Sequence, residues 1–289
     1  MDTNCAINYE GTVIFERKDL VKWGLPRGNQ VALDYKHIIQ SLDSLIRDGQ
    51  GRAARTELLK LNHLKFPREL KSRFASLARR VALDELCVRI LHPIVFPARG
   101  TPSNASELET AEYAAGLIKL GAIREGMGLL KKLNPTSNPQ ILIFQGLGHM
   151  SEWEYARAIP MFEAGSVAPG LSDYQRLVCR VNLSASLVHE QRYAEATPLL
   201  SKLFEDTTSY PVLLGNVMMN SAELKVETND LKGATALLTR AEQLLGQSQS
   251  FDNLYVRKWQ AIVELVATQA SQKALHSLEL IKQEAREKQ

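Results

Sequence analysis

The chain has 289 residues, of which 45% are hydrophobic and 23% are charged, a composition typical of a globular protein and not of a disordered one. It contains no run of 18 apolar residues, and its first residues lack a basic and apolar leader, so we expect neither a transmembrane helix nor a secretory signal. Its three cysteines lie far apart, which favours free thiols and a cytoplasmic location: Cys5, Cys87 and Cys179.

The net charge of +3 is unevenly distributed. Between Arg47 and Arg99 there are 12 basic residues against 5 acidic ones. A basic stretch of this kind can bind nucleic acid or an acidic protein, or it can be an ordinary solvated helix face. A regulatory protein that binds nucleic acid or an acidic partner through residues 47–99 is therefore one alternative function.

Residues 1–33 are expected to form a short irregular arm. Thr12–Phe15 has strand-like composition, and Arg17–Trp23 can form one or two helical turns. The segment is too short for an independent helix-turn-helix domain that binds DNA. We expect it to pack across the first helices through three apolar anchors: Ile14, Phe15 and Trp23.

Residues 34–103 are expected to form an N-terminal helical subdomain with degenerate repeats. Asp34 can cap a first helix, and Gly49–Gly51 marks the turn into a second helix that ends near Asn62. The next stretch, Phe66–Leu91, is predicted to be one long helix.

A proline-rich loop is predicted to close this subdomain. The segment His92–Ser103 contains three prolines and a glycine, which indicates a connection without helix. We expect the apolar residues in its middle to fill a gap in the core: Ile94, Val95 and Phe96.

Residues 104–289 are expected to form a regular array of antiparallel helix pairs. Apolar periodicity and turn residues place the pairs at 105–120 with 122–133, 139–151 with 153–167, 172–190 with 192–206, 211–228 with 230–245, and 252–270 with 271–286.

A spaced pattern recurs in these pairs: a small residue, a large apolar residue four positions later, and a third residue three positions beyond. It falls on Ala54/Leu58/Leu61, Gly126/Leu130/Leu133, Ala158/Phe162/Gly165, Ala196/Leu200/Leu203, Ala234/Leu238/Ala241 and Ala274/Leu278/Ile281. From Gly126 onward the steps are 32, 38, 38 and 40 residues, whereas the step from Ala54 to Gly126 is 72 and leaves room for one degenerate copy.

A second small residue lies twelve positions before the first in four copies: Ala114, Gly146, Ser184 and Ala222. Two antiparallel helices approach closely only where side chains are small, and the large residues then fill the groove against the next pair. One pair cannot bury its apolar face alone, so the copies must stack. The sequence thus predicts an all-α fold.

The pattern resembles the tetratricopeptide repeat, in which a glycine in the first helix is followed by A-x3-F in the second and a proline near the repeat end. Gly146 matches the glycine, Ala158 and Phe162 match the A-x3-F, and prolines lie between repeats at Pro135, Pro139, Pro169 and Pro211. The tryptophan and tyrosine of the family pattern are mostly not matched. The resemblance covers residues 104–285, and more weakly 34–62, and implies a divergent α-solenoid of stacked antiparallel hairpins.

The resemblance also implies a concave groove lined by the first helix of each pair, where a peptide would bind. Its contact positions fall on Gln140, Asn182, His189, Asn216, Asn220, Glu223, Glu227, Trp259 and Gln260, with Lys119, Val178 and Ala185 in the same registers. Asn182 and Asn220 share a register, in which asparagine amides can hold a peptide backbone. Both can equally be ordinary helix-surface residues.

The sequence carries no catalytic or metal-binding pattern that we recognise. No two of its six histidines are spaced i, i+4, and Cys87 and Cys179 lie in apolar helical stretches that suit core thiols. We therefore expect a non-enzymatic adaptor that binds a segment of another protein without a cofactor or metal. A further alternative is a structural subunit, or a homo- or hetero-oligomer, in a larger assembly.

Overall fold

The computed structural model describes residues 34–246, 252–268 and 271–287, and all regular secondary structure in these ranges is helical. The predicted all-α fold is confirmed. The arm expected over residues 1–33, with its anchors, lies outside the described residues.

Fourteen α-helices and two short 3-10 helices follow one another in this part of the chain. They are α2 (Tyr35–Arg47), α3 (Gly51–Leu59), η1 (His63–Lys65), η2 (Arg68–Leu70), α4 (Lys71–Arg80), α5 (Asp84–Val95), α6 (Glu107–Lys119), α7 (Ile123–Leu130), α8 (Gln140–Ser151), α9 (Tyr155–Val167), α10 (Asp173–His189), α11 (Tyr193–Asp206), α12 (Pro211–Glu227), α13 (Leu231–Leu245), α14 (Asp252–Thr268) and α15 (Gln272–Glu287).

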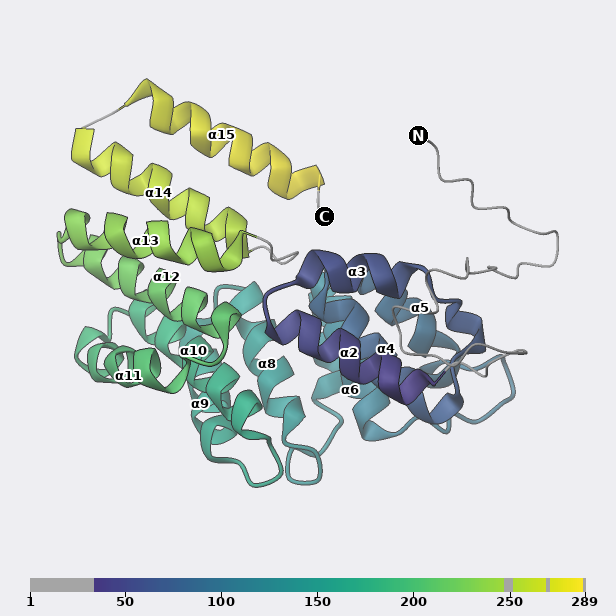
Figure 1. Ribbon diagram of the computed structural model, residues 1–289. Coiled ribbons are helices and arrows are strands. Elements are labelled where there is room, and N and C mark those ends of the chain that lie inside the picture. Colours follow the sequence, from purple (N-terminus) through teal and green to yellow (C-terminus); the bar gives the residue numbers. More distant parts are fainter. Residues whose placement is uncertain (1–33, 247–251, 269–270, 288–289) are drawn as a thin grey trace, which may run out of the picture.

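The helices form seven hairpins, from α2–α3 to α14–α15, and each hairpin packs on its neighbours in chain order (Figure 1). The first helices also contact one another from hairpin to hairpin, as in α2 with α4, α4 with α6, α6 with α8, α10 with α12, and α12 with α14. This is the stacked solenoid that the repeat predicts, and the five expected pairs from residue 105 onward agree with the helices within a few residues.

Six of the hairpins share one turn. In each turn a residue with positive φ follows the first helix, and the next backbone N–H donates to the carbonyl five residues earlier at 2.7–2.9 Å. This bond closes a Schellman motif, which satisfies the last free carbonyls of a helix. The positive-φ residues are Gly49, Ala82, Gly121, Trp153, Gln191 and Asn229.

The small residues of the repeat lie where the helices approach most closely. All six second-helix positions are buried, from Ala54 to Ala274, and so are the four first-helix positions. At Gly126 a Cβ atom would stand 2.7 Å from the Ala114 carbonyl oxygen, which shows that the two positions face each other inside one hairpin. The predicted role of the small residues in helix contact is confirmed.

The copy missing between Ala54 and Gly126 lies in the hairpin α4–α5. Cys87 takes the place of the small residue there, and it is followed at the expected spacing by the buried Leu91 and Ile94. Ala75, twelve positions before Cys87, is also completely buried. The segment 34–103 therefore contains two full hairpins.

Two predictions in this region are wrong. Phe66–Leu91 is not one helix, because Ala82 at φ 55° ends α4 and reverses the chain into α5. The segment from His92 does not begin a loop, because α5 continues through Pro93 to Val95. Ile94 and Val95 are buried as expected, whereas half of Phe96 is exposed. Asp34 does cap α2, by accepting the backbone N–H groups of Lys36 and His37.

The first hairpin lies against the later part of the array. The guanidinium of Arg47 lies over the Tyr174 ring of α10 at 4.9 Å, and a Cβ atom at Gly49 would stand 3.8 Å from Val212 of α12. Figure 1 shows α2 and α3 beside the middle of the array, with α14 and α15 at one end. The superhelix therefore turns enough to bring α2 next to α10 and α12.

Candidate functional site

The inner side of the superhelix is hollowed by a channel. Two cavities of about 450 and 400 Å³ share five lining residues and therefore adjoin each other, and we call the two together the channel; the shared residues are Arg79, Phe144, Leu147, Tyr174 and Val178. We call the first the arginine end and the second the aromatic end. Together they are lined mainly by the first helices of the hairpins, α4, α6, α8, α10, α12 and α14.

Most of the predicted contact residues line this channel. Six lie at the aromatic end and one, Gln140, lies at the arginine end; the six are Asn182, His189, Asn216, Asn220, Glu223 and Trp259. Glu227 is exposed and lines neither cavity, and the amide of Gln260 donates to Glu242 at 2.9 Å outside both cavities.

The two register-matched asparagines are already bonded within the protein. The Asn220 amide donates to the Val181 carbonyl and to the Ser184 hydroxyl, both at 3.1 Å, and so joins α12 to α10. The Asn182 amide donates to Val178 of its own helix at 2.8 Å. Asn220 therefore stabilises the packing of two hairpins, and both of its amide hydrogens are in use.

Glu223 is the most perturbed acid in the channel. It is buried, and its Oε1 lies 3.2 Å from Nδ1 of His189, whose ring stacks on Tyr155 with 4.1 Å between centroids. Burial raises the pKa of Glu223 to about 7, against the attraction of Lys258, and burial lowers the pKa of His189. Near neutral pH this pair is therefore only partly charged.

Aromatic rings surround Lys258 at the same end. Its Nζ lies 4.9 Å from the centroid of Tyr255 and 4.8 Å from that of Trp259. Trp153 is 70% exposed at the turn before α9 and approaches Tyr155 edge-on. A bulky side chain at positive φ costs free energy, so Trp153 holds this turn against its backbone preference.

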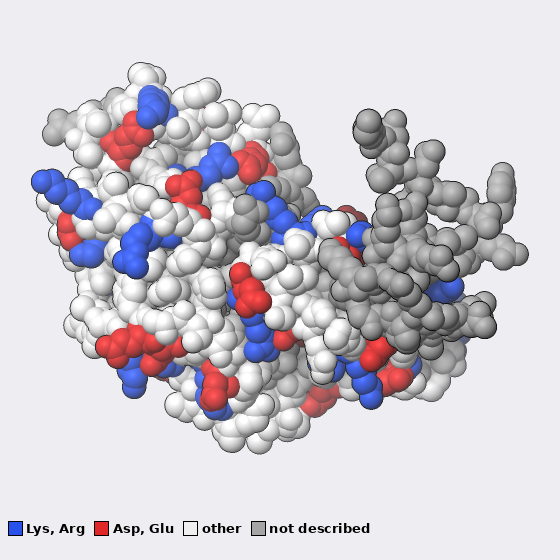
Figure 2. All heavy atoms as spheres, in the orientation of Figure 1, with Lys and Arg blue, Asp and Glu red and all other residues white. Residues whose placement is uncertain are grey.

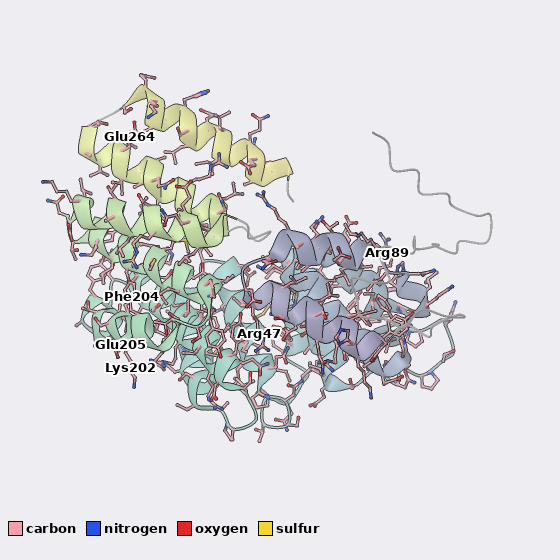
Figure 3. All side chains as sticks on the ribbon, in the orientation of Figure 1. Arg47, Arg89, Lys202, Phe204, Glu205 and Glu264 are labelled. Carbon is pink, nitrogen blue, oxygen red and sulfur yellow. The ribbon has the colours of Figure 1, made fainter. Side chains whose placement is uncertain are left out.

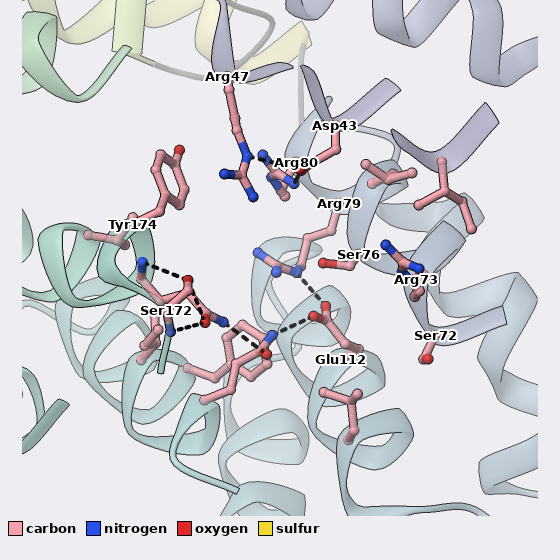
Figure 4. A pocket seen from close by; sticks show the side chains of 18 of the residues that line it. Asp43, Arg47, Ser72, Arg73, Ser76, Arg79, Arg80, Glu112, Ser172 and Tyr174 are labelled. Carbon is pink, nitrogen blue, oxygen red and sulfur yellow. Dashed lines mark hydrogen bonds and ion pairs between the residues drawn. The ribbon is translucent and has the colours of Figure 1, made fainter. Parts of the chain in front are cut away.

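A chain of hydrogen bonds crosses the arginine end (Figure 4). Arg79 of α4 and Gln140 of α8 both donate to Glu112 of α6, at 3.0 and 2.7 Å, and Gln175 of α10 donates to Gln140 at 3.3 Å. Glu112 is almost fully buried. Gln140 therefore has a structural role here, because it links four consecutive first helices into one polar layer.

Arginines supply most of the remaining polar surface at this end. Arg47, Arg73, Arg79 and Arg80 line the cavity together with Asp43. These arginines are not among the contact positions predicted from the sequence. The register of Asn182, Ala185 and His189 on α10 nevertheless corresponds to Arg73, Ser76 and Arg80 on α4. That register becomes visible only when Ala75 is recognised as the small residue of its helix.

Neither a family model nor a curated protein matches this chain in the comparisons. Among the described residues, no helix combines the length and the apolar character needed to cross a membrane. In the same part of the chain, no three His, Cys, Asp or Glu side chains are grouped so that they could hold a metal ion.

Proposed function

We propose that this protein is a non-enzymatic adaptor of the tetratricopeptide-like kind, which holds a segment of another protein in the channel. The observation that carries the proposal is the pair of adjoining cavities that follow the first helices of consecutive hairpins. Because hairpin packing already fixes these helices, most of the ordering cost on binding falls on the ligand.

The lining of the aromatic end suits a peptide ligand. The rings of Tyr155 and Tyr255 offer contact area, and the largely buried Trp259 forms part of the wall. Asn216 has a buried side-chain oxygen without a hydrogen-bond partner among the described residues. Aromatic anchors with a few polar groups are typical of sites where one or two peptide side chains supply most of the affinity.

The basic stretch gives less support to the nucleic-acid alternative. Six of its basic residues form ion pairs with acidic side chains, namely Arg47, Lys60, Arg68, Arg79, Arg80 and Arg89. Figure 2 shows basic and acidic side chains interspersed on the face that it presents. Binding to nucleic acid requires unpaired cations that can reach phosphates.

The test is to select linear peptides from a random displayed library and to measure their affinity by fluorescence anisotropy for two matched variants. Ala185→Arg places a long side chain in the aromatic end, whereas Ala194→Arg makes the same change at an exposed position on α11. We expect Ala185→Arg to weaken binding at least tenfold and Ala194→Arg to leave it within twofold. Equal affinities for the two variants would show that the peptide does not bind in the channel.

A further inference from the structure

The arginine end of the channel carries more positive than negative charge. Its charged lining residues are four arginines, from Arg47 to Arg80, and two acids, Asp43 and Glu112. Two positive charges are therefore left without a counter-charge in the lining.

The two acids are fully used by their neighbours. Asp43 is shared, since Arg80 pairs with one of its oxygens and the Nε of Arg47 lies 2.8 Å from the other. Glu112 accepts from both Arg79 and Gln140. Arg73 forms no ion pair among the described residues, and the buried Nη2 of Arg80 has no hydrogen-bond partner there.

Aromatic rings and ion pairs hold three of the four guanidinium groups in place, those of Arg47, Arg79 and Arg80. Arg47 lies over Tyr174 and Arg79 lies over Phe144, at 4.9 and 4.8 Å. Figure 4 shows the guanidinium groups of Arg47 and Arg80 beside each other near Asp43, with Arg79 reaching toward Glu112. Guanidinium groups fixed in this way lose little freedom when they bind the oxygens of an anion.

We infer that the arginine end binds a doubly charged oxyanion group: a phosphoryl group, or two neighbouring carboxylates, on a linear peptide. A phosphoryl group carries a charge of about −1.5 to −2 at neutral pH, which matches the surplus of two positive charges. The hydroxyl groups of Ser72 and Ser76 in the same lining can donate further hydrogen bonds to its oxygens. The inference that a peptide carries this group rests on the proposed function, whereas the inference of an anion site does not depend on it.

The first test uses the full chain and small probes. Arginine Nε–H resonances of ¹⁵N-labelled protein are followed by NMR during titration with inorganic phosphate, with N-acetyl-Glu-Glu amide, and with the neutral N-acetyl-Gln-Gln amide. We expect saturable shifts with phosphate or with the diglutamate, and none with the neutral probe. The stronger of the two anionic probes identifies the source of the charge. No saturable shift with either anion would overturn the inference.

A matched pair of double variants locates the site. Arg47→Gln/Arg73→Gln removes the surplus charge, while Arg79 and Arg80 keep their acidic partners. Arg89→Gln/Arg99→Gln removes two charges from the same basic stretch outside the cavity; Figure 3 shows Arg89 far from Arg47. We expect the first pair to weaken anion binding at least tenfold and the second less than twofold.

Equal losses in the two double variants would show attraction by diffuse charge and would refute a built site. Because these probes contain no library peptide, the result is independent of the Ala185→Arg test. Peptide binding without anion binding would leave the proposed function standing and reject only this inference.

Discussion

At the scale of single residues, Glu223 is the side chain whose ionisation the fold changes most among the channel acids. Its carboxyl group is buried beside His189, and burial raises its pKa from 4.5 to about 7. Because the folded-state pKa lies above the unfolded value, the contribution of this group to stability is complete below pH 4.5. It declines as the pH rises and is lost once the pH has passed 7.

Glu223→Gln should therefore stabilise the protein at high pH. The amide resembles the protonated acid, so the variant avoids a cost of up to about 3 kcal/mol for the buried charge. Urea unfolding of both proteins between pH 4.5 and 8.5 should give a difference in unfolding free energy that is small at pH 4.5, grows toward pH 7 and then levels off.

Glu227→Gln serves as the control, because Glu227 is exposed one turn further along α12. A surface change of this kind should alter the unfolding free energy by no more than about 0.5 kcal/mol. If Glu223→Gln behaves like this control at every pH, the carboxyl group is not held neutral by its surroundings.

At the scale of the elements, the hairpin depends on close contact between its two helices. In α6–α7 this contact is made at Gly126, where a methyl group would stand 2.7 Å from both the Ala114 carbonyl oxygen and Ile118. Backbone cannot move aside as a flexible side chain can, so the helices would have to separate.

Gly126→Ala should destabilise the protein by about 1–3 kcal/mol, as overpacking does in cores. Gly128→Ala is the matched control in the same helix: its methyl group would meet no atom of a neighbouring element within 4 Å. Removing glycine from a helix interior should there add about 0.5–1 kcal/mol. Thermal and urea unfolding measure both changes, and stabilisation by Gly126→Ala would contradict the packing account.

The hairpins after residue 104 could be predicted because their small residues, turns and apolar stripes agree with one another. The hairpin α4–α5 was missed because two local signals are absent. Cys87 is not recognised as a small residue of the repeat, and the reversal falls on Ala82, a strong helix former that only tertiary packing forces to positive φ. An alignment of Ala75 and Cys87 with the small residues of the later copies gives the correct hairpin.

At the scale of the whole molecule, the channel depends on contacts between distant parts of the chain. Arg47 meets Tyr174, and Gly49 lies near Val212, because the superhelix brings the first hairpin beside α10 and α12. The repeat register predicts which helix face points inward and therefore most of the aromatic end. It does not predict how tightly the superhelix turns, so the arginine end could not be assembled from the sequence.

The sequence also could not predict that the amides of Asn182 and Asn220 are hydrogen-bonded within the protein. Their shared register is real, but the register does not determine whether an amide faces a ligand, its own helix, as in Asn182, or a neighbouring helix, as in Asn220. The proposed recognition by the channel therefore relies on its aromatic rings, on Asn216 and on the arginines.

The most direct test of the central claim, that a partner polypeptide lies inside the superhelix, is photo-crosslinking of a selected peptide. A benzophenone side chain is placed at Ala185 or Met219, which line the channel, and at Ala194 or Thr235, which are exposed on second helices. We expect crosslinks from the two channel positions and background yield from the two outer ones. Equal yields from all four positions, or crosslinks from the outer positions alone, would contradict the central claim.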